Sequence, residues 1–274
     1  MNFIEVNGVG LRYELSGSGE HAIVLIHEMG GSLESWDEVA PRLAQQRRVL
    51  RYDTRGAGLS EKVRGTLAID TMVDDLAALM DAVGITRKVA LAGIAVGGAI
   101  ALHAASRLPE RVGAVVVGSP AIGIAADRRA GVLARVERLE REGMRVAVDD
   151  SMAAGYPPEL RTDPARFAAF RARWLGNDPA SYAAIYRMLA ATDLQPELSR
   201  IACPVLVLAG SLDRTRPPAL VEPVARAIPG ARYQLLETGH YMAVATPELL
   251  ATAIGDFLDA VRAEDAGAWQ AVPG

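Results

Sequence analysis

Short strand-like runs recur along the chain and are separated by segments with helical spacing. The runs cover residues 22–26, 48–52, 89–92, 112–117, 204–209 and 232–236. Most of them are continuously apolar, which is typical of strands buried on both faces of a parallel sheet. Segments at 33–45, 69–83, 218–228 and 247–261 repeat apolar residues at helical intervals. The alternation predicts an α/β fold, with a mostly parallel, twisted sheet and helices on both faces.

The alternation is interrupted between residues 121 and 200, where no strand-like run appears. This stretch is rich in Ala and Arg, and its helical pattern is broken at 155–158, 163–164 and 177–179 by Gly, Pro, Asn and Asp. We expect residues 1–120 and 201–264 to form one core. Residues 121–200 would then be a helical cap over the carboxyl ends of the strands, where such sheets bind ligands. Residues 265–274 have no periodicity and are expected to be a loose tail.

Composition narrows the class of protein. The 274 residues are half hydrophobic and carry a net charge of −4 without a basic cluster, so nucleic acid is not expected as a partner. The single cysteine, Cys203, excludes an internal disulfide and offers no metal-ligand spacing. The N-terminus lacks a signal-peptide pattern, and no apolar run approaches the ~20 residues of a membrane span. We therefore expect a cytoplasmic protein without a membrane partner.

The sequence Gly93-Ile94-Ala95-Val96-Gly97 lies between the run at 89–92 and an Ala- and Leu-rich helical segment. A sharp strand-to-helix turn needs small residues on either side, and Gly93 and Gly97 supply them. The stretch resembles the nucleophile elbow G-x-S-x-G of the α/β-hydrolases, with Ala95 in the position of the serine. Threonines 66, 71 and 86 all precede the strand, so none of them can replace the missing hydroxyl at the elbow.

Other positions complete the chemistry that such an elbow serves. In α/β-hydrolases the acid and then the histidine follow the nucleophile along the chain. Asp213 follows the run at 204–209 and His240 follows the run at 232–236, which makes them the candidate acid and base. The candidate oxyanion donors are the backbone N–H groups of Val96 and Met29. Together with Ala95, these residues form the expected site.

Nearly the whole chain resembles the α/β-hydrolase superfamily, and within it the 3-oxoadipate enol-lactonases and related small esterases. The resemblance rests on residues 27–32, the D-x-R-G-x-G-x-S sequence at 53–60, the elbow, Asp213 and Gly239-His240. It implies a serine-type hydrolase of carboxylic esters or lactones with no metal or organic cofactor. It also implies a small-molecule substrate that could carry a carboxylate, and it is compatible with a homodimer.

Ala95 leaves three interpretations open. The favoured one is a hydrolase disabled by a serine-to-alanine substitution, because the other expected parts of the triad are present. The second is a natural ligand-binding pseudoenzyme. The third is a lyase, isomerase or cofactor-free oxygenase that uses His240 and Glu28 for proton transfer and needs no nucleophile.

Glu28 is the second departure, because the superfamily commonly has glycine after the histidine. A carboxylate there is unwelcome near an oxyanion, so we expect the side chain to point outward or to pair with a cap arginine such as Arg128, Arg129 or Arg135. The candidates for substrate contact are His27, Glu28, Tyr156 and Trp174, from the loop after the first buried run and from the cap.

Overall fold

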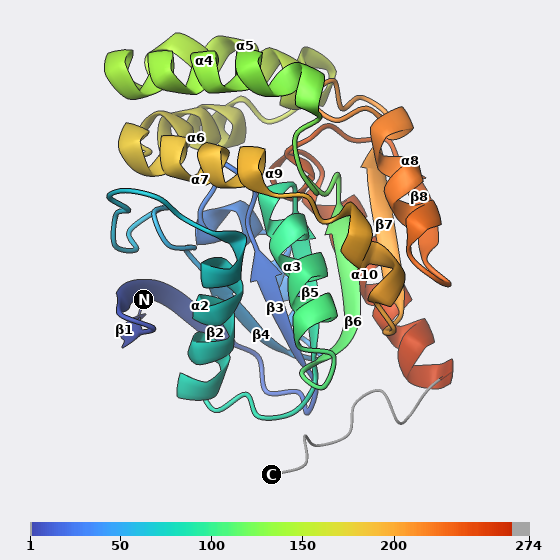
Figure 1. Ribbon diagram of the computed structural model, residues 1–274. Coiled ribbons are helices and arrows are strands. Elements are labelled where there is room, and N and C mark those ends of the chain that lie inside the picture. The colour runs from blue at the N-terminus through green and yellow to red at the C-terminus, as the bar shows by residue number, and fades with distance from the viewer. Residues whose placement is uncertain (1, 265–274) are drawn as a thin grey trace.

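A mostly parallel sheet of eight strands organises the computed structural model, which describes residues 2–264 (Figure 1). The strand order is β1-β2-β4-β3-β5-β6-β7-β8. The strands are β1 (Asn2–Val6), β2 (Val9–Ser16), β3 (Ala22–Ile26), β4 (Arg48–Tyr52), β5 (Val89–Ile94), β6 (Val112–Gly118), β7 (Val205–Gly210) and β8 (Arg232–Leu236). Pairing is parallel from β4 to β8 and antiparallel at β1–β2 and β2–β4. The expected α/β fold is confirmed.

Two layers of helices cover the sheet. Strand residues alternate between two apolar clusters, so that Val24 packs on one face and Ile23 and Leu25 on the other. The first face carries α2 (Ile69–Ala82), α3 (Val96–Arg107) and α8 (Pro218–Ala227), and the second carries η1 (Leu33–Trp36), α1 (Ala40–Leu43) and α10 (Pro247–Glu264). The remaining short helix of the core, α9 (Met242–Ala245), follows His240 and was not anticipated from the sequence.

The single helix expected at residues 33–45 is wrong. The chain forms η1 and α1 instead, with a break between Trp36 and Ala40. Pro41 accounts for part of this, because it has no backbone N–H to continue a helix from residue 37. Trp36, Val39 and Leu43 are nevertheless all buried, so the apolar spacing correctly identified the packed face.

Helices alone occupy the stretch between β6 and β7. They are α4 (Ala126–Glu142), α5 (Arg145–Gly155), η2 (Pro158–Leu160), α6 (Pro164–Leu175), α7 (Pro179–Ala191) and η3 (Gln195–Arg200). The side chains of Asp163 and Asp178 cap α6 and α7, and a proline follows each of them. Figure 1 shows the helices α4–α7 stacked above the carboxyl end of the parallel strands.

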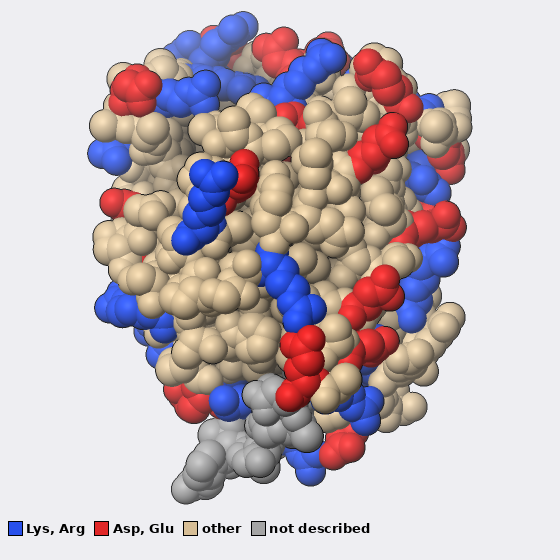
Figure 2. Space-filling model, turned by 90° about the vertical axis from the view of Figure 1, so that its right-hand side faces the viewer, with Lys and Arg blue, Asp and Glu red and all other residues tan. Residues whose placement is uncertain are grey.

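Charge is spread over the molecule without a dominant sign. On the face shown in Figure 2, acidic and basic side chains are interspersed around a broad uncharged expanse. Within residues 2–264, no helix is both long and apolar enough to cross a bilayer. The expected tail at 265–274 lies outside the described residues.

Candidate active site

The elbow between β5 and α3 is strained at one residue. Ala95 has φ 51° and ψ −110°, a conformation that a non-glycine residue adopts only where the surroundings enforce it. A Cβ on Gly93 would collide with the carbonyl of Gly97, and a Cβ on Gly97 would collide with the carbonyl of Ile26. The backbone therefore holds position 95 at the tip of a tight strand-to-helix turn, whatever side chain it carries.

Asp213 and His240 come together from the loops that follow β7 and β8. The imidazole Nδ1 lies 2.8 Å from Asp213 Oδ2, and both side chains are buried. The other carboxylate oxygen, Oδ1, accepts the backbone N–H of Arg216 at 2.8 Å. Since a carboxylate only accepts hydrogen bonds, Nδ1 carries the proton and Nε2 is left with a free lone pair. This is the tautomer that a general base requires.

Ser119 is a further member of this site that the sequence did not single out. It follows β6, is fully buried, and has a φ of 44°. Its hydroxyl donates to Asp213 Oδ2 at 2.8 Å, the oxygen that also accepts from His240. The N–H of Ala95 donates to the carbonyl of Gly118 at 2.9 Å, so the elbow and the acid loop meet at this strand end. In the sequence, the one signal that pointed to Ser119 was its position directly after a buried strand.

The two candidate oxyanion donors come from different segments, the elbow and the loop after β3. Val96 is the first residue of α3, and the first N–H groups of a helix have no partner within it and favour negative charge. Met29 belongs to the loop after β3 and lines the cleft described next. A carbonyl oxygen bound between two such amides would gain stabilisation as it became negative.

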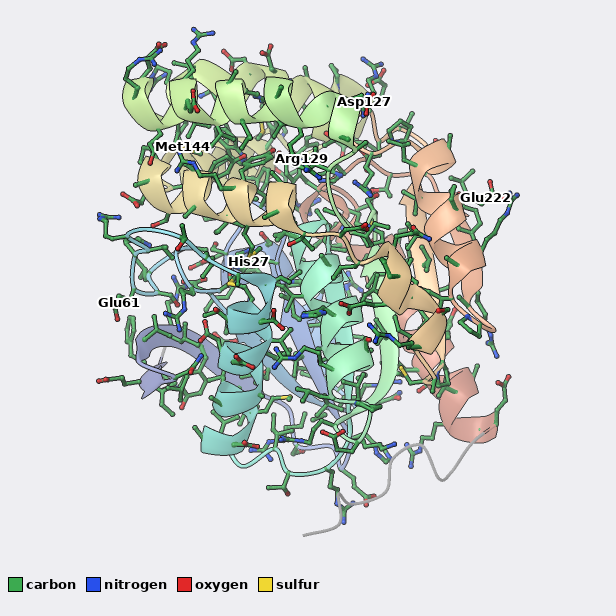
Figure 3. The ribbon with its side chains drawn as sticks, in the orientation of Figure 1. His27, Glu61, Asp127, Arg129, Met144 and Glu222 are labelled. Carbon is green, nitrogen blue, oxygen red and sulfur yellow. The ribbon has the colours of Figure 1, made fainter. Side chains whose placement is uncertain are left out.

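A cleft of about 520 Å³ lies between the cap and the loops that carry His240 and Met29. Its lining combines charged, hydroxyl-bearing and aromatic side chains, chiefly Asp127, Arg128, Arg135, Tyr182, Arg214 and Tyr241. Figure 3 shows Asp127 at one end of the cap, on α4. Burial raises the pKa of Tyr182 and of Tyr241, so both keep their hydroxyl protons and can donate hydrogen bonds to a ligand.

Known proteins share this arrangement of core and cap. A family model described as "Serine aminopeptidase, S33" matches residues 17–240. The chain belongs to this α/β-hydrolase family. The 3-oxoadipate enol-lactonase 2 of Acinetobacter baylyi is 27% identical over 88% of this chain and 90% of its own length. The putative carbamate hydrolase RutD of Caulobacter vibrioides is 30% identical over 91% of this chain and 96% of its own length.

Solved structures agree with the family assignment. The enol-lactonase from Burkholderia xenovorans LB400 superposes with a TM-score of 0.87 and 29% identity, covering 94% of this chain and all of that one. A thermophilic esterase from Thermogutta terrifontis gives a TM-score of 0.89 with 26% identity over 95% of this chain and 99% of that one. By family, the chain is an α/β-hydrolase of the esterase and lactonase type.

Within this hydrolase, Glu28 does not lie where the sequence led us to expect. Its side chain is 0% exposed, and Oε1 accepts the hydroxyl of Ser35 at 2.7 Å. The expectation that it points outward or pairs with a cap arginine is therefore wrong. The carboxylate turns back under its own loop because Gly31, which has no side chain, leaves room for it: a Cβ there would overlap Glu28 Oε1. Oε2 has no hydrogen-bond partner among the described residues.

The other three candidates for substrate contact also have packing partners, and none of the four is among the cleft-lining residues. His27 Nδ1 donates to the carbonyl of Glu28 at 2.8 Å, and its Nε2 accepts the N–H of Thr54 at 3.0 Å. Figure 3 shows His27 below the cap. Trp174 and Tyr156 are buried in the apolar cluster that the cap helices form with one another and with α9, where Trp174 packs against Gly30.

Arg216 is a second residue that sequence reasoning missed. It is largely buried, its Nε has no hydrogen-bond partner, and no ion pair to its guanidinium is found within residues 2–264. Burial lowers the pKa of Arg216; Asp213 opposes that lowering and Arg128 adds to it. A cation held near a second cation without a carboxylate partner of its own is suited to an anionic ligand.

The described residues contain no group of three or more His, Cys, Asp and Glu side chains arranged to hold a metal ion. Burial raises the pKa of the Cys203 thiol to about 11, so at neutral pH it is a protonated, unreactive group. The reactive groups near the elbow are therefore His240 and the hydroxyls and guanidinium groups of the cleft.

Proposed function

We propose that this chain is a serine-type hydrolase of carboxylic esters or lactones in which alanine replaces the nucleophile. The observation that carries the proposal is Ala95 itself, held in the strained elbow conformation, in a chain whose Asp213 and His240 form a hydrogen-bonded pair. Such strain costs on the order of 1–3 kcal/mol and is found where it serves a function. A methyl group at this position has no chemistry that the strained conformation could serve. Alanine is thus best explained as a substitution that disabled a working site.

In the enzyme with a hydroxyl at position 95, His240 Nε2 would take the proton as the oxygen attacks the substrate carbonyl. Asp213 would hold the imidazolium, and the N–H groups of Met29 and Val96 would stabilise the oxyanion. His240 would return its proton to the departing alcohol oxygen. Water, deprotonated by His240, would then release the acyl group. With Ala95 the first bond cannot form, so the chain as written binds substrate without turnover.

The substrate that fits best is a small ester or lactone bearing a carboxylate. The support is the concentration of guanidinium groups at the cleft: Arg128, Arg135 and Arg214 line it, and Arg216 lies close enough for Arg128 to lower its pKa. The cleft also contains acids, Asp127 and Asp150, but no ion pair joins Arg128, Arg214 or Arg216 to a carboxylate within the described residues. An anionic group on the substrate would supply that partner.

The alternative of a lyase, isomerase or cofactor-free oxygenase, which needs no nucleophile, requires Glu28 to contact the substrate. Glu28 is fully buried and turned towards Ser35, so the structure offers this rival no support. The ligand-binding rival differs from the proposal only in the effect of restoring a hydroxyl, and the same experiment separates them.

The test is hydrolysis of p-nitrophenyl acetate and of a lactone with a free carboxylate, compared between the chain as written, Ala95→Ser, and Ala95→Ser with His240→Ala. We expect turnover only in Ala95→Ser, and a lower KM for the free carboxylate than for its methyl ester. Tight binding by the chain as written with an inert Ala95→Ser would favour the pseudoenzyme. Turnover by the chain as written would favour chemistry that needs no nucleophile.

A further inference from the structure

The cap is hydrogen-bonded, backbone to backbone, to the loops that carry the candidate acid and base. At the end of α5, the carbonyl of Gly155 accepts the N–H of His240 at 2.8 Å and the N–H of Tyr241 at 3.3 Å. The carbonyl of Ala154 accepts the N–H of Arg214, the residue after Asp213, at 3.1 Å. The last carbonyls of a helix have no partner within it. In this protein two of them hold the active-site loops.

The contact between α5 and the histidine loop leaves no room for a side chain. A Cβ on Gly155 would lie 2.6 Å from Tyr241 Cε2 and 3.0 Å from His240 Cβ. A Cβ on Gly239 would collide with the carbonyl of Gly155. Two glycines therefore allow the strand-end loop and the helix end to approach as bare backbone. Any group added at residue 155 would push on the ring of Tyr241 and on His240 beside it.

A third cap contact reaches the oxyanion loop. The side-chain amide of Asn177, between α6 and α7, donates to the carbonyl of Gly30 at 2.9 Å, and the indole of Trp174 packs against the same glycine. Gly30 follows Met29, the candidate oxyanion donor. The loops of the acid, the base and one oxyanion donor are thus each bonded to the cap.

We infer that the cap positions the catalytic loops, and that Gly155 is the positioning residue that holds His240 against Asp213. The expected effect on kcat rests on the proposed function. The expected effect on the position of His240 rests on the hydrogen bonds alone. The carbonyl end of α5, which has eleven residues, also carries partial negative charge, which favours the imidazolium that forms when His240 takes a proton. If the cap lifted as a rigid lid, it would break the backbone hydrogen bonds between α5 and the catalytic loops and so disturb the Asp213–His240 pair. Substrate therefore enters through the open cleft while the cap stays in place.

Gly155→Ala tests the inference, with Gly255→Ala as the matched control. Gly255 is a helical glycine of α10 whose added Cβ would meet nothing within 4 Å. In the Ala95→Ser background we expect Gly155→Ala to lower kcat by about 100-fold, because a displacement of about 1 Å in a catalytic group has that effect. The added Cβ would also press on Tyr241, which lines the cleft, so KM can rise as well, and the fall in kcat at saturating substrate is the diagnostic effect. The control should leave both constants unchanged.

A spectroscopic measurement keeps the inference separate from the proposed function. In the chain as written, the Nδ1 proton of His240 bonded to Asp213 should give a far-downfield proton resonance, and Gly155→Ala should abolish it while Gly255→Ala retains it. An inert Ala95→Ser with this pattern intact would defeat the proposed function alone. A resonance unchanged in Gly155→Ala, or a kcat equal to that of the control, would overturn the positioning role.

Asn177→Ala is the second variant, for the case in which Gly155→Ala does not fold. It removes the bond to Gly30 and leaves the histidine loop untouched. We expect a fall in kcat with the His240 resonance retained. If kcat in this variant matches that of the parent, the cap does not position the loop of Met29, and the inference fails for that loop.

Discussion

Asp213 and Glu28 are both buried carboxylates that follow strands of the sheet, and their surroundings differ sharply. Asp213, after β7, accepts three hydrogen bonds, from Ser119, His240 and the backbone of Arg216. Glu28, after β3, accepts one, from Ser35, and leaves an oxygen without a partner. Both side chains are almost completely buried, so burial alone does not distinguish them.

The difference in hydrogen bonding indicates different roles for the two carboxylates. A buried carboxylate is stable when hydrogen bonds saturate its oxygens. Asp213 reaches that state through residues from three separate loops, and one of those residues lines the cleft. The hydrogen bond of Glu28 lies within its own loop and the following helix. Burial raises the pKa of Tyr241, which lines the cleft, and the charge of Glu28 adds to that rise. We therefore expect Asp213 to orient His240 and Glu28 to stabilise the loop that contains Met29.

The largest effect that could break this comparison comes from Asp213→Asn in the Ala95→Ser background. An amide at Oδ2 can donate to the imidazole and would favour the tautomer with the proton on the wrong nitrogen. We expect kcat to fall by about 10⁴-fold, the loss that the same substitution causes in a Ser-His-Asp triad. Steady-state hydrolysis of p-nitrophenyl acetate measures this. Equal activity in Asp213→Asn and its parent would mean that another group orients His240.

Ser119→Ala should have an intermediate effect. The substitution removes one of the three bonds to Asp213 but leaves the bonds from His240 and Arg216 in place. A hydrogen bond to a charged group contributes about 1.5–3 kcal/mol, so we expect urea unfolding to show a loss of stability of about that size. The same loosening of Asp213 should lower kcat by about tenfold. Full activity with full stability would show that Ser119 contributes nothing to the acid.

The alternation of strands and helices was predictable because period and run length directly report burial on a sheet. Asp213 and His240 could be selected because they follow strands in the order in which α/β-hydrolases place the acid and the histidine, and parallel strands bring their carboxyl ends to one edge. The elbow was visible from Gly93 and Gly97, whose spacing is dictated by a backbone collision. In these cases the physical cause of the structure lies in residues that are close together in the sequence.

Ser119, Arg216 and the direction of Glu28 could not be obtained in this way. Each depends on a partner remote in sequence or on space left by another residue, as Gly31 leaves space for Glu28. Trp174 and Tyr156 lie in an apolar cluster and not in the lining of the cleft, and the sequence could not indicate this for a related reason. A large aromatic side chain in a cap can line a pocket or fill the cap interior. Both roles give the same spacing in the sequence, and only the packed structure distinguishes them.

Glu28→Gln is the smallest of the expected effects and tests the comparison from its other side. The amide oxygen can still accept from Ser35, and the substitution removes a buried charge that has no cation partner among the described residues. In the Ala95→Ser background we expect kcat to change by less than about threefold, and the midpoint of urea unfolding to stay the same or rise. Ser35→Ala is the matched control for the bond itself.

A large loss of activity in Glu28→Gln would reverse the roles assigned to the two carboxylates. General acid–base groups contribute about 10²–10⁴-fold to rate, so a fall of at least about 100-fold would place Glu28 in the chemistry despite its burial. The decisive background for that outcome is the chain as written, with Ala95 in place. If that chain turns over a substrate and Glu28→Gln abolishes the turnover while folding normally, the missing serine was never needed, and His240 and Glu28 work as a pair.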